Sequence, residues 1–328
     1  MNQLEECYHQ LNHVVEYSCD KLYNCINNFL FQKVDFGKVS SFIPIWVADC
    51  GINPEGNCSK DQYDMYRNHA RYSIFGLFIY RYDLWSKIAA IQDRLQAVEI
   101  FLRKFYHIVP YEAKYEECHY SCAARASGER ETEAYVLLNS IFVAYASVFD
   151  LLTKVAVEQF EFGKYDFSKY KKMHSCSSLF CKTLKNIDSS LKEEGLLFNE
   201  PPVIRKIETF RNEYVHNGPW DLRCCIYSTA VSGEPADVII YSPDMDENGN
   251  FVTSGSRNKF YSQGNRINIQ LPQMIKDATG IIEATIEQLC VLYQKNTNLN
   301  IDESYTLDCM NEILEYQISL SKNSKNKL

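Results

Sequence analysis

The chain has 328 residues, of which 46% are hydrophobic and 13% aromatic, and its formal net charge is −8. This composition is typical of a packed globular protein and excludes a wholly disordered chain, while the negative charge excludes a general nucleic-acid binder. No apolar run of about 18 residues is present, and the chain does not begin with a basic segment before an apolar one, so we expect neither a transmembrane helix nor a signal peptide. Thirteen cysteines, an odd number in a chain of this size, favour free thiols in a reducing cytoplasm.

The first third of the chain predicts helices with an extended segment between them. Apolar residues recur at three- and four-residue steps from 2 to 30, which indicates a helix with one buried face. Residues 42–48 predict a short strand, and a shorter helix is expected over 60–78. Asp83 is the expected N-cap of a long helix that ends before Pro110.

The polar, Cys- and Ser-rich residues 110–127 form the predicted boundary between two regions. Residues 1–125 would be an N-terminal helical region of unknown role, and residues 128–298 would be a helical domain. Residues 299–328 would add a C-terminal helix and a polar tail.

The second region predicts further helices. A helix opening at Gly128 carries apolar residues spaced 3-4-3-4-3, and this seam is either a core or a dimer face. Its members are Tyr135, Leu138, Phe142, Tyr145, Phe149 and Leu152. Another helix is expected over 168–193, and Pro201 and Pro202 are expected to start the next one.

Residues 223–270 change character. Short β-prone runs alternate there with Gly, Pro and Asn turns, which predicts a small antiparallel β-meander inserted between helices. Two of these runs are 249–253 and 265–269. A final long helix is predicted to begin at Leu271 and to pack on the helix of residues 128–160.

The segment 208–220 has the pattern most typical of a functional site. It places Arg211 five residues before His216, and Asn-Gly-Pro at 217–219 stops the helix directly afterwards. His216 is therefore expected to be the last or next-to-last helical residue, where the helix dipole favours the imidazolium by roughly 0.3 to 1 kcal/mol. Five residues along a helix are about 7.5 Å and about 140° apart, so the pair shares one face only if the helix unwinds at its end.

The sequence from Arg211 to His216, Arg-Asn-Glu-Tyr-Val-His, resembles the Arg-(Asn/His)-x-x-x-His signature of HEPN domains. These are all-helical RNases found in toxins, abortive-infection proteins and RNA-targeting CRISPR effectors. The resemblance covers residues from about 128 to 298 and implies a mainly α, up-and-down helical bundle, here with the β-meander insert and extra N-terminal helices. HEPN domains combine the Arg/His pairs of two domains, so a chain with one motif is expected to act as a homodimer.

The activity that the resemblance implies is metal-independent RNA cleavage without a cofactor, leaving 2′,3′-cyclic phosphate and 5′-hydroxyl ends. His216 would be a general acid or base, with its symmetry mate in the other role. Arg211 would bind the phosphate, and Asn212 would orient the substrate or brace the helix. The expected supporting residues are Asp150, Glu213 and Asn217. Asp150 either holds Arg211 or His216 in position or is a partly exposed acid at a helix edge.

RNA capture needs local positive charge, and residues 164–185 contain six lysines and one acid, Asp166. The lysines are Lys164, Lys169, Lys171, Lys172, Lys182 and Lys185. They predict an RNA-binding face, and the alternative is a solvated helix face. The expected partners are RNA, a second copy of the chain and an operon-encoded regulator or antitoxin. HEPN toxins that a nucleotidyltransferase silences carry Tyr two residues after the His, but Gly218 stands there, so that form of control is not expected.

Three alternatives remain. Asp244 to Gly249 resembles the first half of a calcium-binding EF-hand loop, but the twelfth position is Gly255 rather than Glu, which favours a hairpin turn. Cys118, His119 and Cys122, with Cys50 and Cys58 upstream, could form a zinc site, but their spacings match no common template and favour a set of buried thiols. The alternative function is a non-catalytic helical interaction protein that keeps the fold without the chemistry.

Overall fold

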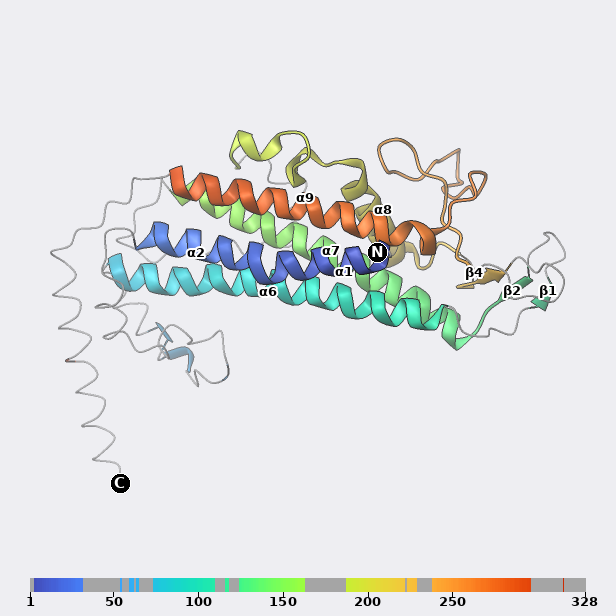
Figure 1. Cartoon of the computed structure of the whole chain (residues 1–328), viewed down its shortest axis with the longest axis horizontal. Helices are drawn as coiled ribbons and strands as arrows, with labels where there is room; N and C mark the ends of the chain where they lie inside the picture. The colour runs from blue at the N-terminus through green and yellow to red at the C-terminus, as the bar shows by residue number, and fades with distance from the viewer. Residues whose placement is uncertain are drawn as a thin grey trace, which may run out of the picture. The chain divides into compact units, whose positions relative to one another are not determined.

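The protein is mainly helical with one small antiparallel sheet (Figure 1). The computed structural model describes residues 3–31, 54, 59–61, 63–64, 73–109, 116–117, 124–162, 187–221, 223–228, 238–295 and 315. The predicted strand at 42–48, nearly all of the helix predicted at 168–193 and the C-terminal helix lie outside these residues. The end of the segment predicted to be helical at 168–193 is a short 3-10 turn, η4 (Ser189–Lys192).

The N-terminal segment is helical, as its periodicity predicts. Helix α1 (Gln3–His13) continues through a π-helical turn, η1 (Val14–Ser18), into α2 (Cys19–Leu30). Helix α6 (Ser73–Ile108) begins well before Asp83, so the prediction that Asp83 caps this helix is wrong. No proline lies between residues 73 and 83 to stop the helix, and it therefore runs through Asp83.

Helix α7 (Glu129–Phe162) supplies the centre of the core. All six members of its predicted seam, Tyr135 to Leu152, are fully buried within this chain. The seam is therefore a core and not a free dimer face. By length and composition α7 could cross a membrane, but a buried apolar seam is typical of the central helix of a globular protein.

The residues group into two compact units, each assembled from separate stretches of chain. The first unit contains residues 1–19, 90–152 and 188–288, and the second contains residues 20–89, 153–187 and 289–328. Helices α6, α7 and α9 (Ile267–Lys295) each contribute to both units.

Side chains on α9 join it to three other helices of the first unit. The hydroxyl of Tyr145 on α7 lies 2.7 Å from Thr279 Oγ1, which confirms that the last long helix packs on α7. Lys276 Nζ lies 2.7 Å from Glu6 Oε2 on α1. On α6, Tyr106 donates a 2.6 Å hydrogen bond to the carbonyl of Asn268. Pro272 lies inside α9 and has no N–H for that carbonyl, so Tyr106 replaces the missing helical donor.

The sheet has the order β1 (Glu116–Glu117), β2 (Ala124–Ala126), β3 (Ile226–Ser228) and β4 (Val238–Ile239), and all neighbours are antiparallel. Figure 1 shows β1 next to β2, with β4 nearby; β3 pairs with both β2 and β4. The prediction of a meander confined to residues 223–270 is therefore wrong in part, because β1 and β2 come from the predicted boundary segment.

The strand predicted at 265–269 is also wrong, because α9 begins at Ile267. In the first turn of α9, the side chain of Asn268 makes hydrogen bonds to the backbone of residues 238 and 240, as a neighbouring strand would. Its Oδ1 accepts from the Ile240 amide at 3.0 Å, and its Nδ2 donates to the Val238 carbonyl at 2.9 Å. The β-prone residues therefore start a helix whose first turn completes the edge of the sheet.

The second unit has its own buried contacts. The Tyr80 hydroxyl on α6 donates to Glu158 Oε2 on α7 at 2.9 Å, and both side chains are fully buried. Phe29 on α2 and Tyr293 on α9 pack with ring centroids 5.6 Å apart. These contacts join α2, α6, α7 and α9 within this unit.

Candidate functional site

Helix α8 (Pro202–Asn217) carries the Arg/His motif and keeps regular geometry to its end. Pro202 occupies the first helical position, as predicted, and Ile204, Ile207 and Phe210 form the buried stripe. At the other end the Gly218 amide donates to the Tyr214 carbonyl at 3.1 Å, and Gly218 has a φ of 87° that favours glycine.

His216 is therefore the next-to-last helical residue, as predicted. The helix does not unwind, so Arg211 and His216 remain about 140° apart around its axis. Within one chain they face different directions and do not form a single cluster.

Asn212 holds Arg211 in place. The guanidinium Nη1 donates to Asn212 Oδ1 at 2.7 Å. Arg211 is half-buried, and its Nε is enclosed and has no hydrogen-bond partner among the residues described. The hydrogen bond to Asn212 therefore fixes the orientation of the guanidinium.

His216 is exposed on the outer face of α8, next to Val215, which is 48% exposed. An exposed imidazole is free to exchange protons with a substrate or with water. The position of His216 therefore leaves its imidazole accessible from outside the chain.

Glu213 joins α8 to the segment that follows it. Its carboxylate is almost completely buried and lies 2.7 Å from Lys259 Nζ. The other oxygen accepts from Asn217 Nδ2 at 2.8 Å. Glu213 and Asn217 thus bond to each other, and Glu213 attaches the loop around Lys259 to the motif helix.

Several predicted site residues stay predictions. Asp150 is half-buried on α7, and its role toward Arg211 or His216 stays a prediction. The six lysines from Lys164 to Lys185 lie outside the described residues, as do Cys118, His119 and Cys122. Among the residues that are described, no three His, Cys, Asp or Glu side chains form a group that could hold a metal ion.

Residues 244–251 form a hairpin turn, as predicted in preference to a calcium loop. Met245 and Phe251 form an antiparallel bridge. Within the turn, Asp246 Oδ1 accepts from the Asn248 amide at 3.0 Å and from the Asn250 amide at 2.8 Å. The hydrogen bond from the Asn250 amide is the main reason that the pKa of Asp246 is lowered. The Asp246 carboxylate therefore makes hydrogen bonds to backbone amides within the turn.

A second carboxylate, Asp244, organises the same segment. It accepts from the Ser262 amide and hydroxyl at 2.7 and 2.6 Å, and from the Gln263 amide at 2.9 Å. Burial acts to raise the pKa of Asp244, but these hydrogen bonds outweigh it and leave the pKa lowered. Asp244 therefore ties the hairpin to residues 262–263.

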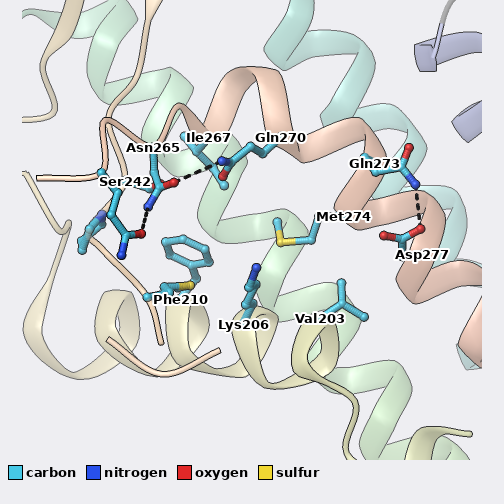
Figure 2. A pocket seen from close by; sticks show the side chains of 13 residues that line it. Val203, Lys206, Phe210, Ser242, Asn265, Ile267, Gln270, Gln273, Met274 and Asp277 are labelled. Atoms are coloured by element: carbon cyan, nitrogen blue, oxygen red, sulfur yellow. Dashed lines mark hydrogen bonds between the residues drawn. The ribbon is translucent and has the colours of Figure 1, made fainter. Parts of the chain in front are cut away.

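A pocket of about 360 Å³ lies between α8 and the first turns of α9. Figure 2 shows Lys206 extending from α8 toward Met274 of α9, with Phe210 beside it. Most of the other polar groups are amides bonded among themselves or to Asp277, as in the 2.7 Å bond from Gln273 Nε2 to Asp277 Oδ1. The charged groups in its described lining are Lys206 and Asp277, and the remaining polar groups are amides and one hydroxyl, which suit binding of a polar group.

A larger pocket, of about 740 Å³, is formed by the residues directly after α8 and by the loop 256–264. Its walls include the aromatic side chains of Tyr227, Tyr241 and Tyr261, and its charged groups are Asp221, Arg257 and Lys259. Sequence reasoning missed this site. The available signal was the run Ser-Arg-Asn-Lys-Phe-Tyr at 256–261, which mixes cations and aromatic rings.

Comparisons of the chain with known protein families, with curated proteins and with solved structures find no match. Any assignment to a family therefore depends on the motif of α8.

Proposed function

We propose that this protein is a metal-independent endoribonuclease of the HEPN type, with an active site composed from two copies of the chain. The observation that carries the proposal is the arrangement on α8. An exposed His216 and an Arg211 held by Asn212 lie on one regular helix at the spacing of the HEPN motif.

The reaction would be an internal transfer at phosphorus. The ribose 2′-hydroxyl loses a proton and attacks the adjacent phosphorus, the bond from phosphorus to O5′ breaks, and O5′ takes up a proton. The products are a 2′,3′-cyclic phosphate and a 5′-hydroxyl. A histidine suits both proton transfers because its ordinary pKa lies close to neutral pH. Arg211 would bind the phosphate oxygens and stabilise the charge that grows on them.

The geometry of α8 supports the requirement for two copies. One chain presents His216 and Arg211 about 140° apart, too far around the helix to enclose one phosphate. One histidine also cannot act as base and acid in the same step. A second α8 facing the first would supply the other imidazole and a second guanidinium.

The test is cleavage of single-stranded RNA by the full chain in EDTA, with analysis of the product ends. We expect cyclic-phosphate ends from the wild type and a loss of about 100-fold or more for His216→Ala, the scale of a general acid or base. His9→Ala, on the exposed side of α1, is the matched histidine control. Cyclic-phosphate ends that persist unchanged in His216→Ala would refute the proposal.

A growth assay covers an enzyme that needs an activator, because the expected setting is antiviral defence or a toxin role. Wild type, Arg211→Ala and His216→Ala would be expressed with and without phage challenge. Equal growth of all three, together with no cleavage, would favour a non-catalytic interaction protein.

A further inference from the structure

We propose that the 740 Å³ pocket behind the end of α8 binds one nucleotide, with the base against tyrosine rings and the phosphate at Arg257. This inference deepens the proposed ribonuclease, because the nucleotide would be one unit of its RNA, but its binding test does not depend on cleavage. The shared ligand chemistry is a nucleoside phosphate, supplied either by an RNA strand or as a free mononucleotide.

The aromatic wall is preorganised. Tyr261 donates its hydroxyl to the Trp220 carbonyl at 2.7 Å, and Tyr227 donates its hydroxyl to Asp221 Oδ2 at 3.1 Å. Tyr227 and Tyr241 meet edge to face with centroids 5.2 Å apart. Because the hydroxyls are held by the protein, the rings are fixed in place and their apolar surfaces line the cavity.

The hydroxyl groups also keep their protons. Burial raises the pKa of both Tyr227 and Tyr261, so both hydroxyls stay neutral donors at physiological pH. No tyrosinate charge arises to repel a phosphate.

Among the described residues that line this pocket, Arg257 and Lys259 are cations and Asp221 is a carboxylate. Lys259 is already paired with Glu213. Arg257 is exposed and has no carboxylate partner among the residues described. Its backbone is held by a tight turn, in which its amide and carbonyl both bond to Ser254 at 3.0 and 2.8 Å. Arg257 is therefore the group most available to a phosphate, which a guanidinium binds through two parallel hydrogen bonds.

The size of the cavity agrees with this ligand. Small-molecule sites usually have volumes of about 300 to 1,000 Å³, and an unstacked base can fill such a site by stacking on aromatic side chains. Each stacked base contributes roughly 1 to 3 kcal/mol. A simple phosphate ion would leave the aromatic wall without a contact.

The pocket is attached to the motif helix in two ways. Its lining begins at Pro219, directly after the residue that caps α8. Lys259 on its rim pairs with the buried Glu213 of α8. A nucleotide held here would therefore fix an RNA strand beside the end of α8 that carries His216.

The test uses the full chain and a fluorescein-labelled single-stranded RNA with 2′-O-methyl riboses, which cannot be cleaved. Arg257→Ala and Tyr261→Leu should each weaken binding by about five- to tenfold or more, in line with loss of one charged or stacking contact. Tyr261→Phe keeps the ring but loses its hydrogen bond to the Trp220 carbonyl, so it should weaken binding less than Tyr261→Leu. Arg94→Ala, an exposed arginine on α6, is the matched control and should also bind like the wild type.

A competition arm with free mononucleotides separates the two sources of ligand. If free mononucleotides displace the labelled RNA and Arg257→Ala weakens this displacement, the site binds nucleotides as such. If they do not displace the RNA, but the pocket variants weaken RNA binding, the site binds an RNA strand. RNA binding that neither pocket variant changes, or no binding of either ligand, would overturn the inference. Pocket-dependent binding together with cleavage that does not need His216 would refute the ribonuclease proposal and leave this one standing.

Discussion

Gly249 gives the sharpest test of how the hairpin is fixed to the motif helix, and the change is Gly249→Ala. Gly249 has a φ of 85°, and its carbonyl accepts from Thr209 Oγ1 on α8 at 3.0 Å. A Cβ atom there would lie 2.5 Å from the Pro202 carbonyl oxygen and 2.9 Å from the Lys206 amide nitrogen. Both atoms belong to the backbone of α8, so no side-chain rotation relieves the clash.

The cost has two parts. The left-handed backbone costs alanine about 1 to 2 kcal/mol, and overpacking adds about 1 to 3 kcal/mol. The lower entropy of the unfolded chain returns about 0.4 to 1 kcal/mol. We therefore expect the free energy of unfolding to fall by about 1 to 4.5 kcal/mol for Gly249→Ala.

The assay is urea unfolding followed by far-UV circular dichroism, with Gly255→Ala as the control. Gly255 also has a positive φ, 58°, but nothing lies within 4 Å of a Cβ atom placed there. The control isolates the backbone cost, and the difference between the two variants measures the close approach to α8. If the two lose the same stability to within about 0.5 kcal/mol, the reasoning about this contact is wrong.

Three further predictions concern stability. The pKa of Asp244 is lowered in the folded chain, so the carboxylate contributes to the free energy of unfolding above its unfolded pKa of about 3.9, and this contribution is lost as the pH falls below that value. Asp244→Asn should therefore flatten the loss of stability below about pH 4. Acid unfolding measures this, and an acid profile that the variant does not change would contradict it. Tyr106→Phe should lower the free energy of unfolding in urea by about 1 kcal/mol, because it removes the donor to the Asn268 carbonyl. The loss should be smaller in a chain that also carries Pro272→Ala, since the alanine restores a backbone amide for that carbonyl. Equal losses with and without Pro272→Ala would show that Tyr106 does not replace the missing amide. Phe142→Ala should cost about 3 to 5 kcal/mol, since this fully buried ring stacks on another ring 5.0 Å away; thermal unfolding measures it, and a loss below about 1 kcal/mol would show that the cluster is loosely packed.

Local patterns in the sequence predicted the elements whose causes are local. The 3-4-3-4-3 spacing from Tyr135 to Leu152 predicted a helix and is fully buried on α7. The prolines and the Asn-Gly-Pro stop predicted both ends of α8. In each case residues within one or two helical turns determine the result.

The misses have non-local causes. Residues 265–269 are β-prone, but Asn268 is fixed by Ile240 and Val238, some thirty residues earlier. Strand β3 pairs with Ala124–Ala126, about a hundred residues away. No local periodicity reports such pairings, because they depend on which surfaces meet in the folded chain.

The features of the candidate site also fall into those with local causes and those with non-local causes. The positions of Arg211 and His216 on the helix followed from their spacing, and so did the angle between them. The large pocket could not be derived, because its residues are far apart in the sequence and meet only in the folded chain: Asp221, Tyr227 on β3, Tyr241 and Arg257.

The contact between Glu6 and Lys276 joins residues 270 positions apart within the first unit. Because a ribosome makes the chain from its N-terminus, α1 is made long before α9. The contact between the two helices can therefore form only late in synthesis. Contacts of such long range also slow folding, because the chain must close a long loop before it gains the contact energy. The protein is thus expected to fold late in its synthesis, and a chain cut just before Ile267 should fail to form its first unit.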